Sequence, residues 1–229
     1  MDSLARGAPR RRHRAARGAR VRRRGGRPAR LSPRQSGAGA AAARLRLFVA
    51  LNLPSPVRQA LWQAVEPVRE RGLPVKWVRP DGIHVTLKFL GDVSEERAAD
   101  VRAALGRAAR GARPLPLALG EFGVFPDFQR PRVVWAGITA DSGLEILQHR
   151  VEQEFEPLGF PTEARPFRPH VTLGRAGREA RPRDFTGLEA ALGDLQFEAA
   201  VVVESVDLMQ STLESAGAVY HVTHSERLS

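Results

Sequence analysis

The sequence contains the tetrapeptide His-Val-Thr-Leu twice, at His84–Leu87 and at His170–Leu173. Both histidine and threonine are scarce in this chain. Six His and seven Thr among 229 residues predict roughly 0.2 His-x-Thr triplets by chance, and the chain has three. Two copies that share four residues in a row therefore indicate a duplicated site.

In a β-strand, side chains two residues apart project from the same face. We therefore expect His84 to point with Thr86, and His170 to point with Thr172. The residues around them are apolar and are expected to face a core on the other side of each strand: Val85, Leu87, Phe89, Val171 and Leu173. Each strand would then present one imidazole and one hydroxyl on a face that packing does not need.

Two imidazoles and two hydroxyls around one small substrate are suited to in-line displacement at phosphorus. Because the unperturbed pKa of imidazole is about 6.5, one histidine can act at neutral pH as a base while the other donates a proton. The Thr86 and Thr172 hydroxyls would hydrogen-bond the non-bridging phosphate oxygens. This scheme needs no metal or other cofactor, and two histidines without an acidic third ligand make a poor zinc site. The spacing alone does not say which histidine is the acid.

The other histidines are expected to be structural. The third triplet, His221-Val222-Thr223, lacks the following Leu and the preceding turn residue, and it lies close to the C-terminus. His13, His149 and His224 are most simply solvated or packing residues.

Hydrophobic periodicity and turn residues predict alternating groups of strands and helices. Ser55 and Ser94 are expected to be helix N-caps, and Pro67 is expected to kink the first helix. The third helix carries apolar residues at Leu144, Leu147, Val151 and Phe155. The expected strands are 44–53, 75–78, 83–90, 115–122, 132–138, 167–175, 197–211 and 218–224, and the expected helices are 55–71, 95–110 and 143–159.

Strands that follow one another directly contradict the regular strand–helix alternation of a parallel α/β fold. We therefore predict an α+β fold made of two pseudo-symmetric lobes of mostly antiparallel sheet with flanking helices. Each lobe would carry one His-Val-Thr-Leu strand, and the active-site cleft would lie between the lobes.

Composition separates an N-terminal segment from the rest of the chain. Residues 1–43 contain 13 Arg and one acidic residue, Asp2, so their net charge is +12, whereas that of the whole chain is +11. Residues 44–229 therefore carry a net charge of −1, and the high pI says nothing about their partner. The segment 1–43 has almost no large apolar residues, which predicts a disordered tail rich in Arg, Gly and Ala. An RNA-binding arm and a targeting signal are alternatives to the favoured interpretation, a functionally idle tail.

The remaining composition describes the expected globular domain, residues 44–229. The chain has no cysteine, which excludes a disulfide framework and a thiolate nucleophile. It has no apolar run of the roughly 18 residues that a membrane span needs. We expect a soluble, cytoplasmic monomer.

With these motifs and their flanks, the chain resembles the two-histidine phosphoesterase superfamily. It resembles most closely the RNA 2′,3′-cyclic phosphodiesterases, historically labelled 2′-5′ RNA ligases. The resemblance covers residues 44 to about 221 and depends on the segments KWVRPDGIHVTLKFLG, RPRVVWAGI, FRPHVTLGR and VDLMQSTLESAGAVY.

The resemblance implies hydrolysis of a terminal 2′,3′-cyclic phosphate of RNA, or of a small cyclic nucleotide, to a 2′-phosphomonoester without a metal. It also implies that His84 is the proton donor to the leaving oxygen and that His170 is the proton acceptor from water. Lys88 and Arg175 are candidate phosphate contacts, although Arg175 is out of phase with His170 unless the strand ends at Gly174. Phe48 and Trp135 are candidates to stack a base or to pack in the core.

Other functions remain open at this point. The same pair of motifs would serve a 2′-5′ RNA ligase or another cyclic-phosphate hydrolase of the superfamily. It would also serve a non-catalytic module that binds RNA ends, in which the histidines only recognise phosphate.

Overall fold

The computed structural model describes residues 44–214 and 217–229, which belong to one compact unit. The predicted tail, residues 1–43, lies outside the described residues. In the part of the chain that is described, no helix is both long enough and apolar enough to cross a lipid bilayer.

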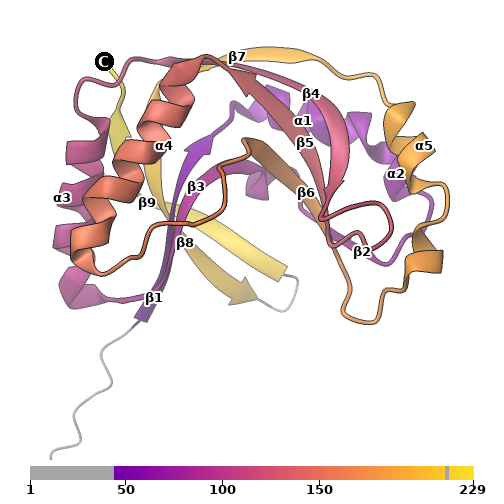
Figure 1. Ribbon diagram of the computed structural model, residues 1–229, viewed down its shortest axis with the longest axis horizontal. Coiled ribbons are helices and arrows are strands. Elements are labelled where there is room, and N and C mark those ends of the chain that lie inside the picture. Colours follow the sequence, from indigo (N-terminus) through magenta and orange to yellow (C-terminus); the bar gives the residue numbers. More distant parts are fainter. Residues whose placement is uncertain (1–43, 215–216) are drawn as a thin grey trace, which may run out of the picture. The chain divides into compact units, whose positions relative to one another are not determined.

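The described strands form a single sheet whose neighbouring strands are all antiparallel (Figure 1). Its order is β7-β4-β5-β6-β3-β1-β8-β9, and β2 pairs with β6 off this path. The strands are β1 (Arg44–Asn52), β2 (Val75–Trp77), β3 (His84–Ser94), β4 (Leu115–Phe125), β5 (Val133–Ala140), β6 (His170–Ala176), β7 (Ala199–Val203), β8 (Ser205–Glu214) and β9 (Gly217–Arg227).

The two halves of the sheet repeat one arrangement outward from β3 and β6. Beyond β3 come β1, β8 and β9, and beyond β6 come β5, β4 and β7. Val85 of β3 pairs with Val171 of β6, and this pairing joins the halves into one continuous sheet rather than two separate sheets. The predicted α+β fold, with two pseudo-symmetric lobes of antiparallel strands, is confirmed.

Helices cover one face of the sheet. The α-helices are α1 (Ser55–Ala64), α2 (Glu66–Arg69), α3 (Ala98–Ala109), α4 (Ser142–Phe155) and α5 (Leu188–Gly193). Helices α3 and α4 lie together over the half that contains β3, β8 and β9, and α2 and α5 lie together over the other half (Figure 1). The apolar stripe predicted for the third helix is buried in α4, as expected for a helix that packs on a sheet: Leu144, Leu147, Val151 and Phe155.

Strand β1 shows the two faces of the sheet most directly. Its residues Leu47, Val49 and Leu51 belong to the main core under the helices. The alternate residues Phe48 and Ala50 point the other way and form a small second cluster with Met209 and Tyr220. We call the side of the sheet that carries Phe48 and Ala50 the open face.

Some local predictions were wrong. The helix predicted over 55–71 is divided at Val65 into α1 and α2, so the break precedes Pro67. Ser55 is the first residue of α1 and not its cap, and neither Ser55 nor Ser94 makes a side-chain capping hydrogen bond. The strand predicted over 197–211 is two strands, β7 and β8, because the chain leaves the sheet at Glu204.

Candidate active site

The two His-Val-Thr-Leu segments lie side by side where the halves of the sheet meet. His84 is the first residue of β3, and His170 is the first residue of β6. Because these strands are antiparallel and Val85 pairs with Val171, His84 lies across from Thr172, and Thr86 lies across from His170. Each histidine therefore has one threonine along its own strand and another across the joint.

Both motifs contain a β-bulge at their leucine. Between β1 and β3, Ala50 is opposite Thr86 and Val49 is opposite Lys88, so Leu87 is an extra residue. Between β5 and β6, Trp135 is opposite Thr172 and Val134 is opposite Gly174, so Leu173 is an extra residue. An extra residue shifts the alternation of side chains by one for the rest of the strand.

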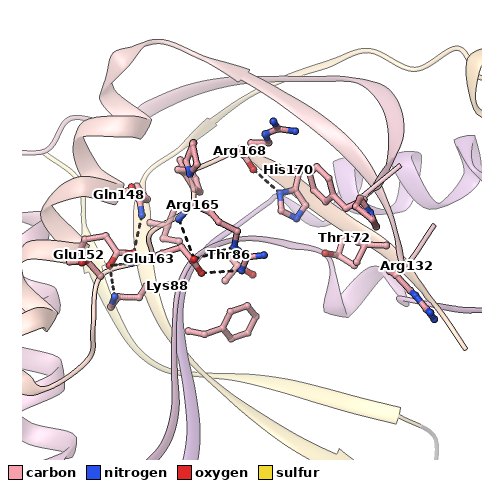
Figure 2. Close-up of a pocket in the computed structure, with 18 of the residues that line it drawn as sticks. Thr86, Lys88, Arg132, Gln148, Glu152, Glu163, Arg165, Arg168, His170 and Thr172 are labelled. Carbon is pink, nitrogen blue, oxygen red and sulfur yellow. Dashed lines mark hydrogen bonds and ion pairs between the residues drawn. The ribbon is translucent and has the colours of Figure 1, made fainter. Parts of the chain in front are cut away.

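This shift reverses two predictions made from strict alternation. Phe89 was expected in the core, yet it pairs with Phe48 on the open face and is 63% exposed. Lys88 was expected beside the phosphate, yet it pairs with Val49 and points to the helical side, where it is 6% exposed. The Lys88 ammonium forms an ion pair with Glu152 of α4 and donates to the Pro161 carbonyl at 2.8 Å (Figure 2).

The second bulge brings Arg175 to the same face as His170 and Thr172. The sequence prediction that Arg175 turns in is therefore supported, but not because the strand ends, since β6 continues to Ala176. Arg175 is exposed and lines the same cleft as Thr86, His170 and Thr172. Its charge contributes to lowering the pKa of both His84 and His170.

Phe48 was a candidate to stack on a base or to pack in the core, and its position agrees only with packing in the core. The Phe48 side chain is 1% exposed, so it has no free ring face. Its ring lies 4.8 Å from the His84 ring and 5.5 Å from the Tyr220 ring, measured between centroids. Phe48 therefore packs against the His84 imidazole. Trp135 lies next to Thr172 and against the Phe125 ring at 5.2 Å.

The orientation of His170 is fixed by a backbone carbonyl. Its Nδ1 lies 2.7 Å from the carbonyl oxygen of Arg168 (Figure 2), so Nδ1 carries the proton and donates it there. In the neutral imidazole this leaves Nε2 with a free lone pair, which is the form that accepts a proton. Burial lowers the pKa of His170 and Arg175 lowers it further, while the Arg168 carbonyl raises it in part.

His84 lies in a more apolar environment. Its ring packs edge-on against Tyr220 with centroids 5.1 Å apart, and it also packs against the Phe48 ring, whose centroid lies 4.8 Å away. Burial lowers the pKa of His84 from 6.5 to about 4, against a weaker opposing effect of the Gly82 backbone. Nδ1 has no partner with hydrogen-bond geometry among the described residues, so the Gly82 backbone affects the pKa only as a nearby dipole. Gly82 precedes His84 by two residues, as Arg168 precedes His170, but only Arg168 accepts a hydrogen bond from its histidine.

The cleft beside these groups has a volume of about 820 Å³ and is bounded by β3, β5, β6 and the segment that joins α4 to β6. Four of the charged residues that line it form ion pairs with one another, Lys88 with Glu152 and Arg165 with Glu163. Three further arginines line it without an acidic partner among the described residues: Arg132, Arg168 and Arg175. The cleft is therefore built for anions. In residues 44–214 and 217–229, no three His, Cys, Asp or Glu side chains cluster as a metal site would require.

Sequence reasoning missed several residues of this cleft. Phe125 contacts the His170 ring edge-on, with centroids 5.0 Å apart, and Phe89 is the exposed aromatic of the first motif. Arg168 was missed because its contribution to His170 is a backbone carbonyl. For Phe89 the sequence did contain a signal. When the two motifs are aligned, Phe89 corresponds to Arg175, and a charged residue at that position indicates an exposed site.

Both halves of the chain are similar to known proteins. The model of the family described as LigT like phosphoesterase matches residues 51–135 and 138–220, one stretch around each motif. An RNA 2′,3′-cyclic phosphodiesterase of Methanothermobacter thermautotrophicus is 32% identical over 179 residues, which are 77% of this chain and 95% of the relative. One of Thermus thermophilus is 37% identical over 184 residues, 78% of this chain and 87% of the relative.

Solved structures show the same fold. A Thermus thermophilus crystal structure matches with a TM-score of 0.65 and 32% identity, covering 80% of this chain and 98% of the other. Escherichia coli LigT complexed with 3′-AMP matches with a TM-score of 0.63 and 25% identity, covering 81% and 99%. With a family match over both halves and relatives of this identity and coverage, the chain belongs to the LigT like phosphoesterase family.

Proposed function

We propose that this protein hydrolyses the terminal 2′,3′-cyclic phosphate of RNA to a 2′-phosphomonoester without a metal ion. The observation that carries the proposal is the crossed arrangement at the joint of the sheet. Two His-x-Thr pairs meet there around one position, and Arg175 lines the cleft with Thr86, His170 and Thr172. The names of the relatives, RNA 2′,3′-cyclic phosphodiesterases, support the same reaction.

In this mechanism His170 is the base. Its Nε2, left free because Nδ1 donates to the Arg168 carbonyl, takes a proton from water as the water oxygen attacks phosphorus. The bond between phosphorus and O3′ breaks, and His84 gives a proton to O3′, so the phosphate stays on O2′. Thr86 and Thr172 donate hydrogen bonds to the non-bridging oxygens, and Arg175 stabilises the charge that develops on them.

The low pKa of His84 fits an acid that is charged only in the complex. In the free protein His84 is neutral at pH 7, because burial and two arginines disfavour its protonated form. A cyclic phosphodiester brings a negative charge beside the ring and offsets Arg175, which raises the pKa of His84. Substrate binding therefore draws in the proton that the leaving oxygen later takes.

The charge of the cleft favours an RNA end over a mononucleotide. A cyclic phosphate carries one negative charge, which Arg175 can balance, and this leaves Arg132 and Arg168 on the cleft wall. Phosphates further along an RNA chain would fit these two guanidinium groups.

The tail, residues 1–43, is idle in this proposal, so a chain that begins at Arg44 should keep full activity on a cyclic mononucleotide.

The test compares a 2′,3′-cyclic mononucleotide with a short oligoribonucleotide that ends in the same cyclic phosphate. We expect both to give the 2′-monophosphate, identified by ³¹P NMR, and the oligonucleotide to have the lower KM. Arg132→Ala should raise KM for the oligonucleotide alone, with Arg130→Ala as a neighbouring exposed control. A 3′-monophosphate product would contradict the proposed assignment of the leaving oxygen, and equal KM values would contradict the role of the extra arginines.

A further inference from the structure

An ion pair on the helical side of the sheet connects β3 to the wall of the cleft. Lys88 is 6% exposed and Glu152 is 7% exposed. The Lys88 ammonium donates to a Glu152 carboxylate oxygen and, at 2.8 Å, to the carbonyl of Pro161. It reaches this position because the bulge at Leu87 turns Lys88 away from the open face.

Glu152 extends the contact further into the same wall. Its Oε2 accepts a hydrogen bond from the backbone N–H of Glu163 at 3.3 Å, and its Oε1 accepts from Gln148 Nε2 at 3.1 Å (Figure 2). Pro161 and Glu163 both belong to residues 159–169, which contain no helix or strand. The pair therefore holds the first half of a segment that has no regular hydrogen-bonding ladder of its own.

The same segment ends at the open face, beside His170. Its residue Arg168 supplies the carbonyl that binds His170 Nδ1 at 2.7 Å. Next to it, the carbonyl of Pro169 accepts from the Ile138 backbone N–H of β5 at 3.2 Å. One end of the segment is thus tied to the sheet, and near its other end Pro161 and Glu163 are held by Lys88 and Glu152.

We infer that Lys88 and Glu152 are positioning residues, which hold the segment Pro161–Arg168 so that the Arg168 carbonyl keeps His170 in the tautomer with a free Nε2. The inference rests on the proposed function, because it assigns Nε2 the role of base. Stability alone does not account for the pair, since replacing a buried ion pair by well-packed apolar residues is often neutral or stabilising. The equivalent residue of the second motif is Gly174, so the fold of the strand does not itself require a lysine.

The first test uses the only two lysines of the chain, Lys76 and Lys88. Lys88→Met should lower kcat on a cyclic mononucleotide by roughly 100-fold, because small displacements of catalytic groups have effects of that size. KM should change by only a few fold, because Arg175 and the threonines are not held by the segment. Lys88→Arg keeps the charge and should retain more activity than Lys88→Met, and Lys76→Met, at an exposed site, should match the wild type.

Two readouts separate positioning from a general loss of structure. The Glu163 amide, protected by Glu152 in the wild type, should exchange its hydrogen faster in Lys88→Met while the amides of β3 and β6 keep their protection. In ¹⁵N NMR, His170 should lose its single Nδ1-protonated tautomer. Unchanged Glu163 exchange and an unchanged His170 spectrum in a variant with lower kcat would overturn the inference, as would full activity of Lys88→Met.

A milder variant covers the case in which Lys88→Met does not fold. Gln148→Ala removes one hydrogen bond to Glu152 from a half-buried position, and we expect a smaller fall in kcat with the same change at the Glu163 amide. His149→Ala, the exposed neighbour on α4, is the matched control and should change neither. If wild-type protein turned over no cyclic phosphate, the proposed function would fail. The exchange and NMR measurements would still decide whether the pair holds the segment and the His170 tautomer.

Discussion

Lys88 and Gly174 occupy equivalent positions in the two motif strands, each directly after the bulged leucine and each facing the helical side of the sheet. Their surroundings explain why the residue types differ. Lys88 extends to Glu152 of α4, whereas a Cβ on Gly174 would lie 2.5 Å from Val75 Cγ1 and 3.0 Å from Trp77 Cε3 of β2. One copy of the duplicated strand thus anchors a segment, and the other accommodates an added strand.

Gly174→Ala should therefore destabilise the protein. The added methyl group overlaps β2, and overpacking of this kind costs roughly 1–3 kcal/mol of the free energy of unfolding. Urea denaturation measures the change, with Gly193→Ala as the control, because a Cβ there meets no atom within 4 Å. Equal stability of the Gly174 variant and the wild type would mean that β2 does not pack against β6 as described.

Phe89→Ala should weaken binding of the nucleotide while the fold is kept. The side chain is 63% exposed on the wall of the cleft, and base–aromatic stacking contributes about 1–3 kcal/mol per base. We expect KM for a cyclic mononucleotide to rise about tenfold, with kcat little changed. Val202→Ala, which also removes an exposed apolar side chain, should leave KM as it is. Steady-state kinetics measure KM for both variants. An unchanged KM for Phe89→Ala would show that the Phe89 ring is not part of the binding site.

The pH dependence follows from the depressed pKa values of both histidines. Since the pKa of His84 is about 4 and that of His170 is also lowered, one protonated and one neutral imidazole coexist in the free enzyme mainly below pH 6.5. We therefore expect kcat/KM to be bell-shaped with its maximum below pH 6.5. The kcat profile should lie at higher pH, because the bound phosphodiester raises both pKa values. Coincident profiles would contradict the proposed proton uptake on binding.

The same shift has a consequence for stability. The pKa of His84 is lower in the folded than in the unfolded protein, so between pH 6.5 and about 4 the unfolded chain binds the proton first. The free energy of unfolding should therefore decrease as the pH falls through this range. His84→Gln should flatten the dependence, which thermal denaturation at several pH values will show. A His84→Gln variant as sensitive to this pH range as the wild type would contradict the burial described for His84.

His221→Ala should leave activity unchanged, because we expect the third triplet to be structural. His221 is exposed on β9, and the Thr223 hydroxyl donates to the Leu208 carbonyl at 3.0 Å. Neither side chain faces the cleft that contains His170. A large loss of turnover in this variant would place the site elsewhere.

Much of this site follows from the sequence, and the part that does not has a specific cause. Alternation along a strand correctly placed His84 with Thr86 and His170 with Thr172, because these residues precede the bulges. It misplaced Lys88 and Phe89 and gave the wrong reason for Arg175, because a bulge is defined by the register with a neighbouring strand. The pairings of Val49 and Val134 that reveal each bulge are long-range, and no local pattern encodes them.

Local sequence patterns could not predict the order of the strands in the sheet, for a similar reason. The duplication of His-Val-Thr-Leu predicted two related lobes, yet the joint between them is the pairing of Val85 with Val171 across 86 positions of the chain. The contribution of Arg168 to His170 was also hidden, because a carbonyl is common to every residue type and only its place in space makes it an acceptor.

The most direct test of the central claim is turnover of a 2′,3′-cyclic mononucleotide in the presence of EDTA by the wild type, His84→Ala and His170→Ala. We expect the wild type to form the 2′-monophosphate at the same rate with and without EDTA. Each variant should stay folded and lose about 10² to 10⁴-fold in kcat, the usual contribution of one proton-transferring group. Loss of wild-type activity in EDTA that a divalent ion restores, or full activity of either histidine variant, would contradict the account.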